Sequence, residues 1–104
     1  MSELWEVLVP RAFNDGTEIP LSHHHVWDER VRNISGGLTI LKSAKGFWQS
    51  PSGEIFQESM IPVRVACTEA QIREIVDFTI GHYQQKAVMA YRVSDYVIIK
   101  HQSE

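Results

Sequence analysis

The sequence has few of the features that would reveal a function. Its 104 residues include one cysteine, Cys67, so no disulfide can form within the chain. No apolar run approaches the roughly 20 residues of a membrane-spanning helix. The first residues do not form the basic and then apolar segments of a signal peptide. A free thiol without a signal peptide favours a reducing compartment, so we expect a cytoplasmic protein with no membrane partner.

Motifs for common cofactors are also absent. The chain has no glycine-rich phosphate loop, no C-x-x-C pair and no H-E-x-x-H run. We therefore expect no cofactor and no resident metal. The net charge is −3, and the 10 Lys and Arg residues are scattered. Because no basic stripe is available to neutralise phosphates, we expect no nucleic-acid partner.

The composition that remains is that of an ordinary globular protein. Hydrophobic residues make up 43% of the chain and charged residues 22%, close to the averages for soluble domains. A chain of this length can bury one core without disulfide or metal. No internal repeat or low-complexity linker divides it, so we predict a single domain over residues 1–104.

The first third of the chain predicts one strand and one helix. Apolar residues alternate over residues 4–13, which indicates a strand, and Pro10 implies a bulge or a frayed end within it. Ser22 is suited to cap a helix over residues 23–35, which Gly36 would end. The apolar stripe of this helix would consist of Val26, Trp27, Val31 and Ile34.

The middle of the chain predicts a short strand over residues 38–41 and then a β-hairpin. Two strands within residues 47–56 are joined by four turn-forming residues. Trp48 and Phe56 flank this turn and are predicted to pair across the strands. Pro62, in the long returning strand, implies a bulge or an edge without a hydrogen-bonded neighbour.

The last third predicts a second helix and an irregular strand. Thr68 and Gln71 form the two halves of a capping box, and apolar residues then recur at helical spacing over residues 69–85. Residues 87–93 and 96–100 are rich in β-formers. They predict either a tight hairpin or one bent strand.

The element order is therefore strand, helix, strand, hairpin, helix, strand. Two helices on one face of an antiparallel sheet bury both helical stripes in the simplest way. We predict an α+β protein with a ferredoxin-like β-α-β-β-α-β sandwich. An extra C-terminal strand is an option that the last segment leaves open.

The residues around the hairpin resemble a family of small bacterial domains of unknown function. The resemblance rests on residues 37–41, 46–48 and 53–59, with residues 13–16 and Trp27 as further matching features. It implies a bacterial protein with a ferredoxin-like fold. Members of the family often follow an export signal, which we expect this chain to lack. The family is itself uncharacterised, so the resemblance implies no reaction.

A run of three histidines at residues 23–25 is the most conspicuous candidate for chemistry. Consecutive helical side chains lie about 100° apart, so the three cannot bind one metal ion. His24 lies one turn from Asp28, and His25 lies one turn from Glu29. Either pair could orient an imidazole for general-base catalysis or supply half of a metal site.

The alternatives for these residues are structural. A metal site would need a third ligand from elsewhere, such as His82; otherwise the histidines are solvated residues of a first helical turn. Glu58 is the candidate carboxylate of the hairpin, although a charged residue on a strand is more often on the solvent face. Cys67 lies just before a helix start, where a thiol pKa is lowered, unless the thiol is buried and inert.

Several aromatic residues are candidates for a ligand cleft or an oligomer interface, where aromatics and Arg are enriched. Packing along an edge strand would explain them equally. The candidates are Trp48, Tyr83, Tyr91, Arg92 and Tyr96.

These observations support three hypotheses. The favoured one is a small homo-oligomeric binding or assembly module, a homodimer or larger, joined through its sheet face or an edge strand. The alternative is a cofactor-independent enzyme of the dimeric α/β-barrel kind with a small-molecule ligand. In that case His24, His25 or Glu58 should line a cavity. A third hypothesis is metal-dependent regulation through the histidine run.

Overall fold

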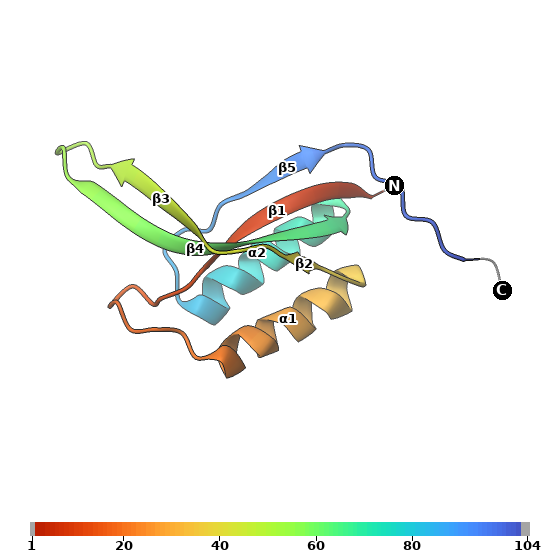
Figure 1. The fold of residues 1–104 in the computed structure, drawn as a ribbon, viewed down its shortest axis with the longest axis horizontal. Helices are drawn as coiled ribbons and strands as arrows, with labels where there is room; N and C mark the ends of the chain where they lie inside the picture. Colours follow the sequence, from red (N-terminus) through yellow and green to blue (C-terminus); the bar gives the residue numbers. More distant parts are fainter. Residues whose placement is uncertain (1, 103–104) are drawn as a thin grey trace.

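The chain folds into a five-stranded antiparallel sheet with two helices on one face (Figure 1). The computed structural model describes residues 2–102. The helices are α1 (Leu21–Ser35) and α2 (Glu69–Tyr83). The strands are β1 (Glu3–Pro10), β2 (Thr39–Ile40), β3 (Ala44–Gln49), β4 (Ile55–Cys67) and β5 (Ala90–Ser94). The predicted α+β class and the placement of both helices on one face are confirmed.

The long strand β4 organises the sheet. The strand order is β2-β4-β1-β5, and β3 pairs with β4 as well. The first half of β4 pairs with β3, and its second half pairs with β1 and, over two residues, with β2. The β3–β4 hairpin therefore extends past the end of β1 and beyond the helices (Figure 1).

The core lies between the sheet and the helices. Alternation along β1 turns Val7 and Val9 toward the helices, where both are buried. The indole N–H of Trp27 on α1 donates to the Thr79 hydroxyl on α2 over 2.9 Å, which ties the two helices together inside the core. The other buried apolar residues are Ile19, Val31, Val63, Val65, Cys67, Ile72, Ile75 and Tyr83.

Helix α1 begins two residues earlier than the sequence predicted, and without a side-chain cap. Pro20 occupies the N-cap position in an extended conformation, so Ser22 falls inside the first turn and its predicted capping role is wrong. Val26 is also misassigned, because it is 55% exposed while Trp27 is buried. Adjacent helical residues point about 100° apart, so Val26 lies off the apolar stripe. Gly36 ends the helix with a left-handed φ of 89°, as predicted.

Helix α2 begins at the predicted capping box. The Gln71 N–H donates to the Thr68 hydroxyl over 3.2 Å, and the Thr68 N–H donates to the Gln71 side chain over 2.9 Å. The Gln71 amide also donates to the carbonyl of Ile34 at the end of α1, over 3.0 Å. The cap of one helix thus fixes the end of the other.

Pro62 occupies the gap between β2 and β3. Leu8, which pairs with Pro62, donates its N–H to the carbonyl of Met89 just before β5, so the polar groups of this pair face away from each other. The nitrogen of Pro62, which carries no hydrogen, therefore points to the side of β4 on which β3 and β2 lie. Pro62 falls between them, because β3 pairs with β4 as far as Met60 and β2 pairs with Val63 and Arg64. The Pro62 carbonyl accepts from the Leu41 N–H over 2.9 Å on this side, so the predicted unpaired edge is limited to the proline nitrogen, and β1 pairs with β4 without a bulge.

The last segment does not form the optional extra strand. Within the described residues, strand structure ends at Ser94, and residues 95–102 have none. The Ser94 hydroxyl donates to the Tyr96 carbonyl over 2.9 Å and accepts from the Tyr96 N–H over 3.1 Å. Because one side chain occupies both main-chain groups of Tyr96, β5 does not continue.

Two segments project from opposite ends of the molecule. The hairpin arm (residues 44–59) lies at one end of the long axis and the C-terminal arm (residues 95–102) at the other (Figure 1). The molecule measures 56 × 29 × 23 Å with a radius of gyration of 15.0 Å. A compact domain of this length would have a radius of gyration of about 13 Å. The arms account for the elongated shape.

Candidate functional site

Two histidines that are far apart in the sequence meet where α1 begins and α2 ends. The rings of His23 and His82 stack with their centroids 3.8 Å apart and their planes 10° from parallel. His23 Nε2 bonds to the His82 carbonyl over 2.7 Å, and His82 Nε2 bonds to the His23 carbonyl over 2.8 Å. A carbonyl oxygen only accepts, so both Nε2 atoms carry a proton and donate. This reciprocal pair is the His23–His82 clasp.

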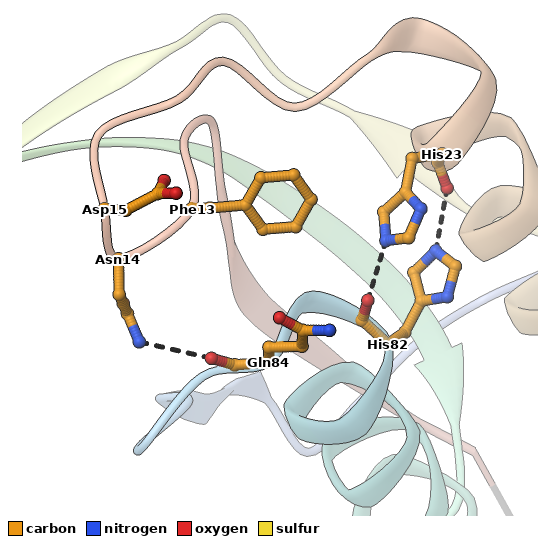
Figure 2. Close-up of a pocket in the computed structure, with 6 residues that line it drawn as sticks. All are labelled: Phe13, Asn14, Asp15, His23, His82 and Gln84. Carbon is orange, nitrogen blue, oxygen red and sulfur yellow. Dashed lines mark hydrogen bonds between the residues drawn. The ribbon is translucent and has the colours of Figure 1, made fainter.

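A shallow hollow lies beside the clasp (Figure 2). Its volume is about 380 Å³, and its lining consists of Phe13, Asn14, Asp15, His23, His82 and Gln84. The Asn14 amide donates to the Gln84 carbonyl over 3.1 Å, which ties the turn after β1 to the end of α2. Two hydrogen bonds from Thr17 lower the pKa of the Asp15 carboxyl. The larger effect comes from the Thr17 hydroxyl and the smaller from its main-chain N–H. The polar groups of this hollow mostly serve the fold.

His24 bonds to Tyr83 rather than to Asp28, the partner that the sequence predicted. Its Nδ1 lies 2.7 Å from the phenol oxygen of Tyr83. Burial raises the pKa of the Tyr83 phenol, with Asp28 adding to the effect, so the hydroxyl keeps its proton and we assign it as the donor. Burial also lowers the pKa of His24, opposed by the nearby Asp28 carboxylate. His24 is thus held neutral with Nε2 protonated.

The other acid–base candidates lie in solvent. His25, Glu29 and Glu58 are exposed. Within residues 2–102, no three His, Cys, Asp or Glu side chains are arranged to hold a metal ion. A second hollow of about 390 Å³ lies between α2 and β5. Neither hollow has His24, His25, Glu29 or Glu58 in its lining. The cavity that the enzyme hypothesis predicted around these residues is not found at either place.

The hairpin arm carries exposed aromatic residues. Trp48 stacks on Phe56 with centroids 4.5 Å apart, which confirms the predicted cross-strand pair. The Trp48 indole N–H donates to Glu58 over 3.2 Å, so this carboxylate is engaged by a neighbour on its own hairpin. Phe47 and Ile55 point to the other face of the arm and are 67% and 72% exposed.

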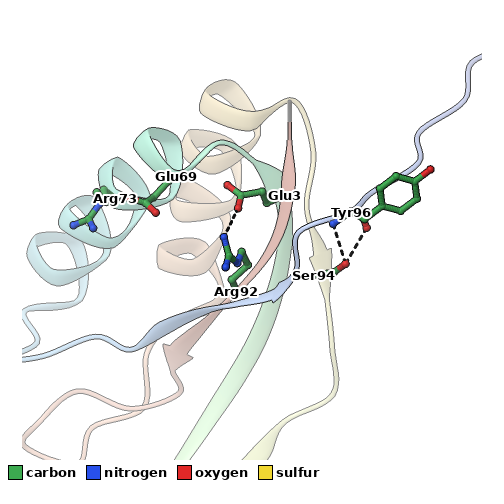
Figure 3. Close-up of polar contacts among 6 residues, drawn as sticks. All are labelled: Glu3, Glu69, Arg73, Arg92, Ser94 and Tyr96. Carbon is green, nitrogen blue, oxygen red and sulfur yellow. Dashed lines mark hydrogen bonds and ion pairs between the residues drawn. The ribbon is translucent and has the colours of Figure 1, made fainter.

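The C-terminal aromatic candidates do not form one cluster. Tyr83 is fully buried in the core, while Tyr91 lies on the sheet face away from the helices. Arg92 forms an ion pair of 2.8 Å with Glu3 (Figure 3). Tyr96 points away from the body of the protein and is 69% exposed (Figure 3). Tyr91 and Tyr96 thus remain available at a surface, whereas Tyr83 does not.

Glu6 is a buried charge that sequence reasoning missed. It lies on the sheet face away from the helices, is 7% exposed, and forms an ion pair of 3.0 Å with Arg64. The Tyr91 hydroxyl also donates to its carboxylate. Arg64, Glu6 and Tyr91 are direct cross-strand neighbours on β4, β1 and β5. The only sequence signal for Glu6 was a charged residue inside an otherwise apolar strand. Its partners depend on the strand register, which the sequence does not show.

Cys67 is inert in the folded protein. It is 1% exposed, and burial raises the pKa of its thiol to about 11, with the Glu3 carboxylate adding to the shift. Of the two alternatives for Cys67, the buried and inert thiol is confirmed, because desolvation raises the thiol pKa. Among the described helices, none is long and apolar enough to cross a membrane.

Comparison with known proteins identifies a fold. No family model and no curated protein matches the chain. Among solved structures, the periplasmic divalent cation tolerance protein CutA of Archaeoglobus fulgidus is similar with a TM-score of 0.68 and 13% identity over 96% of this chain and 89% of that one. A phage SAM lyase in complex with S-methyl-5′-thioadenosine is similar with a TM-score of 0.67 and 10% identity, over 90% of this chain and 81% of that one. CutA1 of Oryza sativa is similar with a TM-score of 0.65 and 9% identity, over 98% of this chain and 83% of that one.

The chain is an α+β protein with a ferredoxin-like fold, as the sequence predicted. At 9–13% identity these similarities support the fold alone, so no ligand or reaction is transferred from those proteins. The resemblance to a bacterial domain family has no matching family model and stays a prediction.

Proposed function

We propose that this protein is a homo-oligomeric assembly module whose two arms bind other copies of the chain. The observation that carries the proposal is an excess of exposed surface. The chain exposes 7425 Å², whereas a compact monomer of its mass exposes about 5,900 Å². The difference, roughly 1,500 Å², is about twice the roughly 800 Å² that each partner buries in a standard protein–protein interface.

Seven of the 13 exposed large hydrophobic residues of the described chain lie on the two arms. On the hairpin arm Phe47, Trp48, Ile55 and Phe56 are between 38% and 72% exposed. On the C-terminal arm Tyr96, Ile98 and Ile99 are between 62% and 74% exposed. Exposed apolar groups gathered in this way mark interaction sites. Full burial of Phe47 and Ile55 alone would contribute about 3–6 kcal/mol.

A second copy of the chain is the occupant that these surfaces fit best. The arms project from opposite ends of the long axis (Figure 1), so one molecule cannot bring them together. Copies that meet through different surfaces form a closed ring or a filament, and copies that meet through the same surface form a two-fold dimer. The predicted homodimer is the smallest assembly in this set. A cytoplasmic location stays a prediction.

The mass of the protein in solution tests the proposal, with a matched pair of variants. Phe47→Ser with Ile55→Ser removes two exposed apolar side chains from the hairpin arm. Leu21→Ser removes one from the start of α1, where Leu21 is 69% exposed and lies outside both arms. We expect the hairpin variant to dissociate at least tenfold more readily than the wild type, and Leu21→Ser to assemble normally. Equal dissociation of both variants, or normal assembly of both, would contradict a role for the hairpin arm.

A further inference from the structure

The flank of the sandwich between α2 and β5 is incompletely covered. The hollow of about 390 Å³ found there has Trp5, Val76, Val88 and Ala90 among its lining residues. Glu69, Arg73 and Asp77 are the charged members of its lining. Arg73 is neutralised by Glu69 at 3.2 Å, and among the described residues Asp77 has no ion-pair partner. The hollow thus combines an apolar floor with one unpaired negative charge.

Trp5 contributes an unused hydrogen-bond donor to this flank. Its indole nitrogen is buried and has no acceptor within the described residues, the one side-chain atom of which this is true. A buried N–H without a partner costs about 1–3 kcal/mol, so such groups are rare unless something else supplies the acceptor. The main-chain carbonyl of a bound segment can serve as this acceptor when the side chains that cover the indole nitrogen move aside.

The edge of β5 beside the hollow is also unpaired. Strand β5 is the last strand of the sheet and has β1 as its neighbour on one side. The Leu8 N–H donates to the Met89 carbonyl, so alternation directs the main-chain groups of Ala90 and Arg92 outward, away from β1. An extended segment can add to such an edge and place alternate side chains over the hollow.

We infer that the C-terminal arm of a second copy binds here as an added strand, with an isoleucine over the Trp5 hollow. This inference rests on the proposed assembly and names the surfaces that meet. Residues 96–100 have the β-branched and aromatic composition of a strand but form no strand in their own chain. In an added strand Ile98 and Lys100 point to the same face, so Ile98 supplies the apolar side chain for the floor. Lys100, exposed and outside every ion pair of the described residues, supplies the charge for Asp77.

The arm of the same chain is directed elsewhere. The two hydrogen bonds between Ser94 and Tyr96 fix the direction in which the arm leaves β5. Figure 3 shows Tyr96 beyond the end of β5, on the side away from Glu69 and Arg73 of α2. The arm therefore leads away from its own hollow, and an arm that fills the hollow comes from another molecule.

The test follows the indole N–H of Trp5 by NMR in the full chain, assigned with Trp5→Phe. In the wild type we expect this proton to be hydrogen-bonded and to exchange with water about tenfold more slowly than in Ile98→Asp, which removes the apolar contact of the arm. Ile98→Val is the matched control and should behave as the wild type. The indole N–H of Trp27, bonded inside the core, should be unchanged in all variants and reports correct folding.

Mixing two defective variants identifies the source of the arm. Val76→Glu places a charge in the hollow and leaves the arm intact, whereas Ile98→Asp leaves the hollow intact. Adding unlabelled Val76→Glu to labelled Ile98→Asp should restore the wild-type Trp5 signal. The unlabelled double variant, Val76→Glu with Ile98→Asp, carries a defective arm and should not restore the Trp5 signal.

Three outcomes would overturn the inference. They are an identical Trp5 signal in the wild type and Ile98→Asp, no restoration on mixing, and a protected Trp5 proton in a wild type of monomer mass. The third would assign the hollow to the arm of the same chain. The mass of each sample separates the two proposals. A wild type that is oligomeric with an unprotected Trp5 contradicts this inference alone, whereas a monomeric wild type contradicts the assembly itself.

Discussion

His23 and His82 each donate a hydrogen bond from Nε2 to the main-chain carbonyl of the other, while their rings stack 3.8 Å apart. The His82 carbonyl lies in the last turn of α2, where no helical N–H is available to it, so the His23 ring satisfies an orphan acceptor. The histidine that the sequence suggested as a distant third metal ligand is therefore a structural partner. The clasp joins the start of α1 to the end of α2.

Removing one ring of the clasp should destabilise the protein. His82→Ala deletes a half-buried hydrogen bond and the stacking surface of His23. We expect the free energy of unfolding to fall by about 1–2 kcal/mol. Urea denaturation measures the loss, with His25→Ala as the control because His25 is exposed and has no side-chain partner among the described residues. Equal stability of the two variants would show that the clasp contributes nothing.

His24 should make stability depend on pH. Its pKa is about 6.5 in an unfolded chain and is lowered in the folded protein, chiefly by burial. As pH falls below about 6.5, the unfolded chain therefore binds a proton that the folded chain does not. The contribution of His24 is fully present above that pH and is lost as pH falls toward the lowered value.

The measurement compares the wild type with His24→Gln, whose side chain can still accept from Tyr83. Between about pH 7.5 and pH 5 the stability of the wild type should fall more steeply than that of the variant. His25→Gln should keep the wild-type slope. Parallel curves for the wild type and His24→Gln would rule out His24 as the source.

Thr79 should be required as an acceptor in the core. Its hydroxyl accepts from the Trp27 indole and donates to the Ile75 carbonyl over 2.6 Å. Thr79→Val keeps the shape but leaves the buried indole N–H unpaired, at a cost of about 1–3 kcal/mol. Thr79→Ser keeps the hydroxyl. Exchange of the Trp27 indole proton should accelerate in the valine variant and not in the serine variant; the reverse order would contradict this assignment.

Cys67 should be unreactive until the protein unfolds. Its burial and a thiol pKa of about 11 leave little thiolate and no access at neutral pH. A colorimetric thiol reagent at pH 8 should therefore react slowly with the native protein and rapidly in guanidinium. Immediate native labelling would mean that the end of β4 opens readily.

Local signals in the sequence predicted the elements well. The Thr68–Gln71 capping box, the left-handed Gly36 and the Trp48–Phe56 pair depend on residues a few positions apart, or on two strands joined by one turn. The predicted Ser22 cap failed for a related reason. Pro20 already supplies the extended residue before the helix, so the helix starts before serine can cap it.

The candidate site could not be predicted in the same way. His23 and His82 are 59 residues apart in sequence, and their contact depends on how α1 packs on α2. Glu6 meets Arg64 only through the register of β1 with β4. The residues around Ile98 have the composition of a strand. Composition does not show whether the neighbouring strand belongs to the same chain or to another copy.

The mass of the native wild-type protein tests the central proposal most directly. Sedimentation or light scattering at micromolar to high micromolar concentration, at neutral pH, measures it without labels or variants. We expect a multiple of the 11.9 kDa chain mass, and dissociation toward the single-chain mass when the hairpin arm is made polar. A strict 11.9 kDa monomer at high micromolar concentration would contradict the proposal.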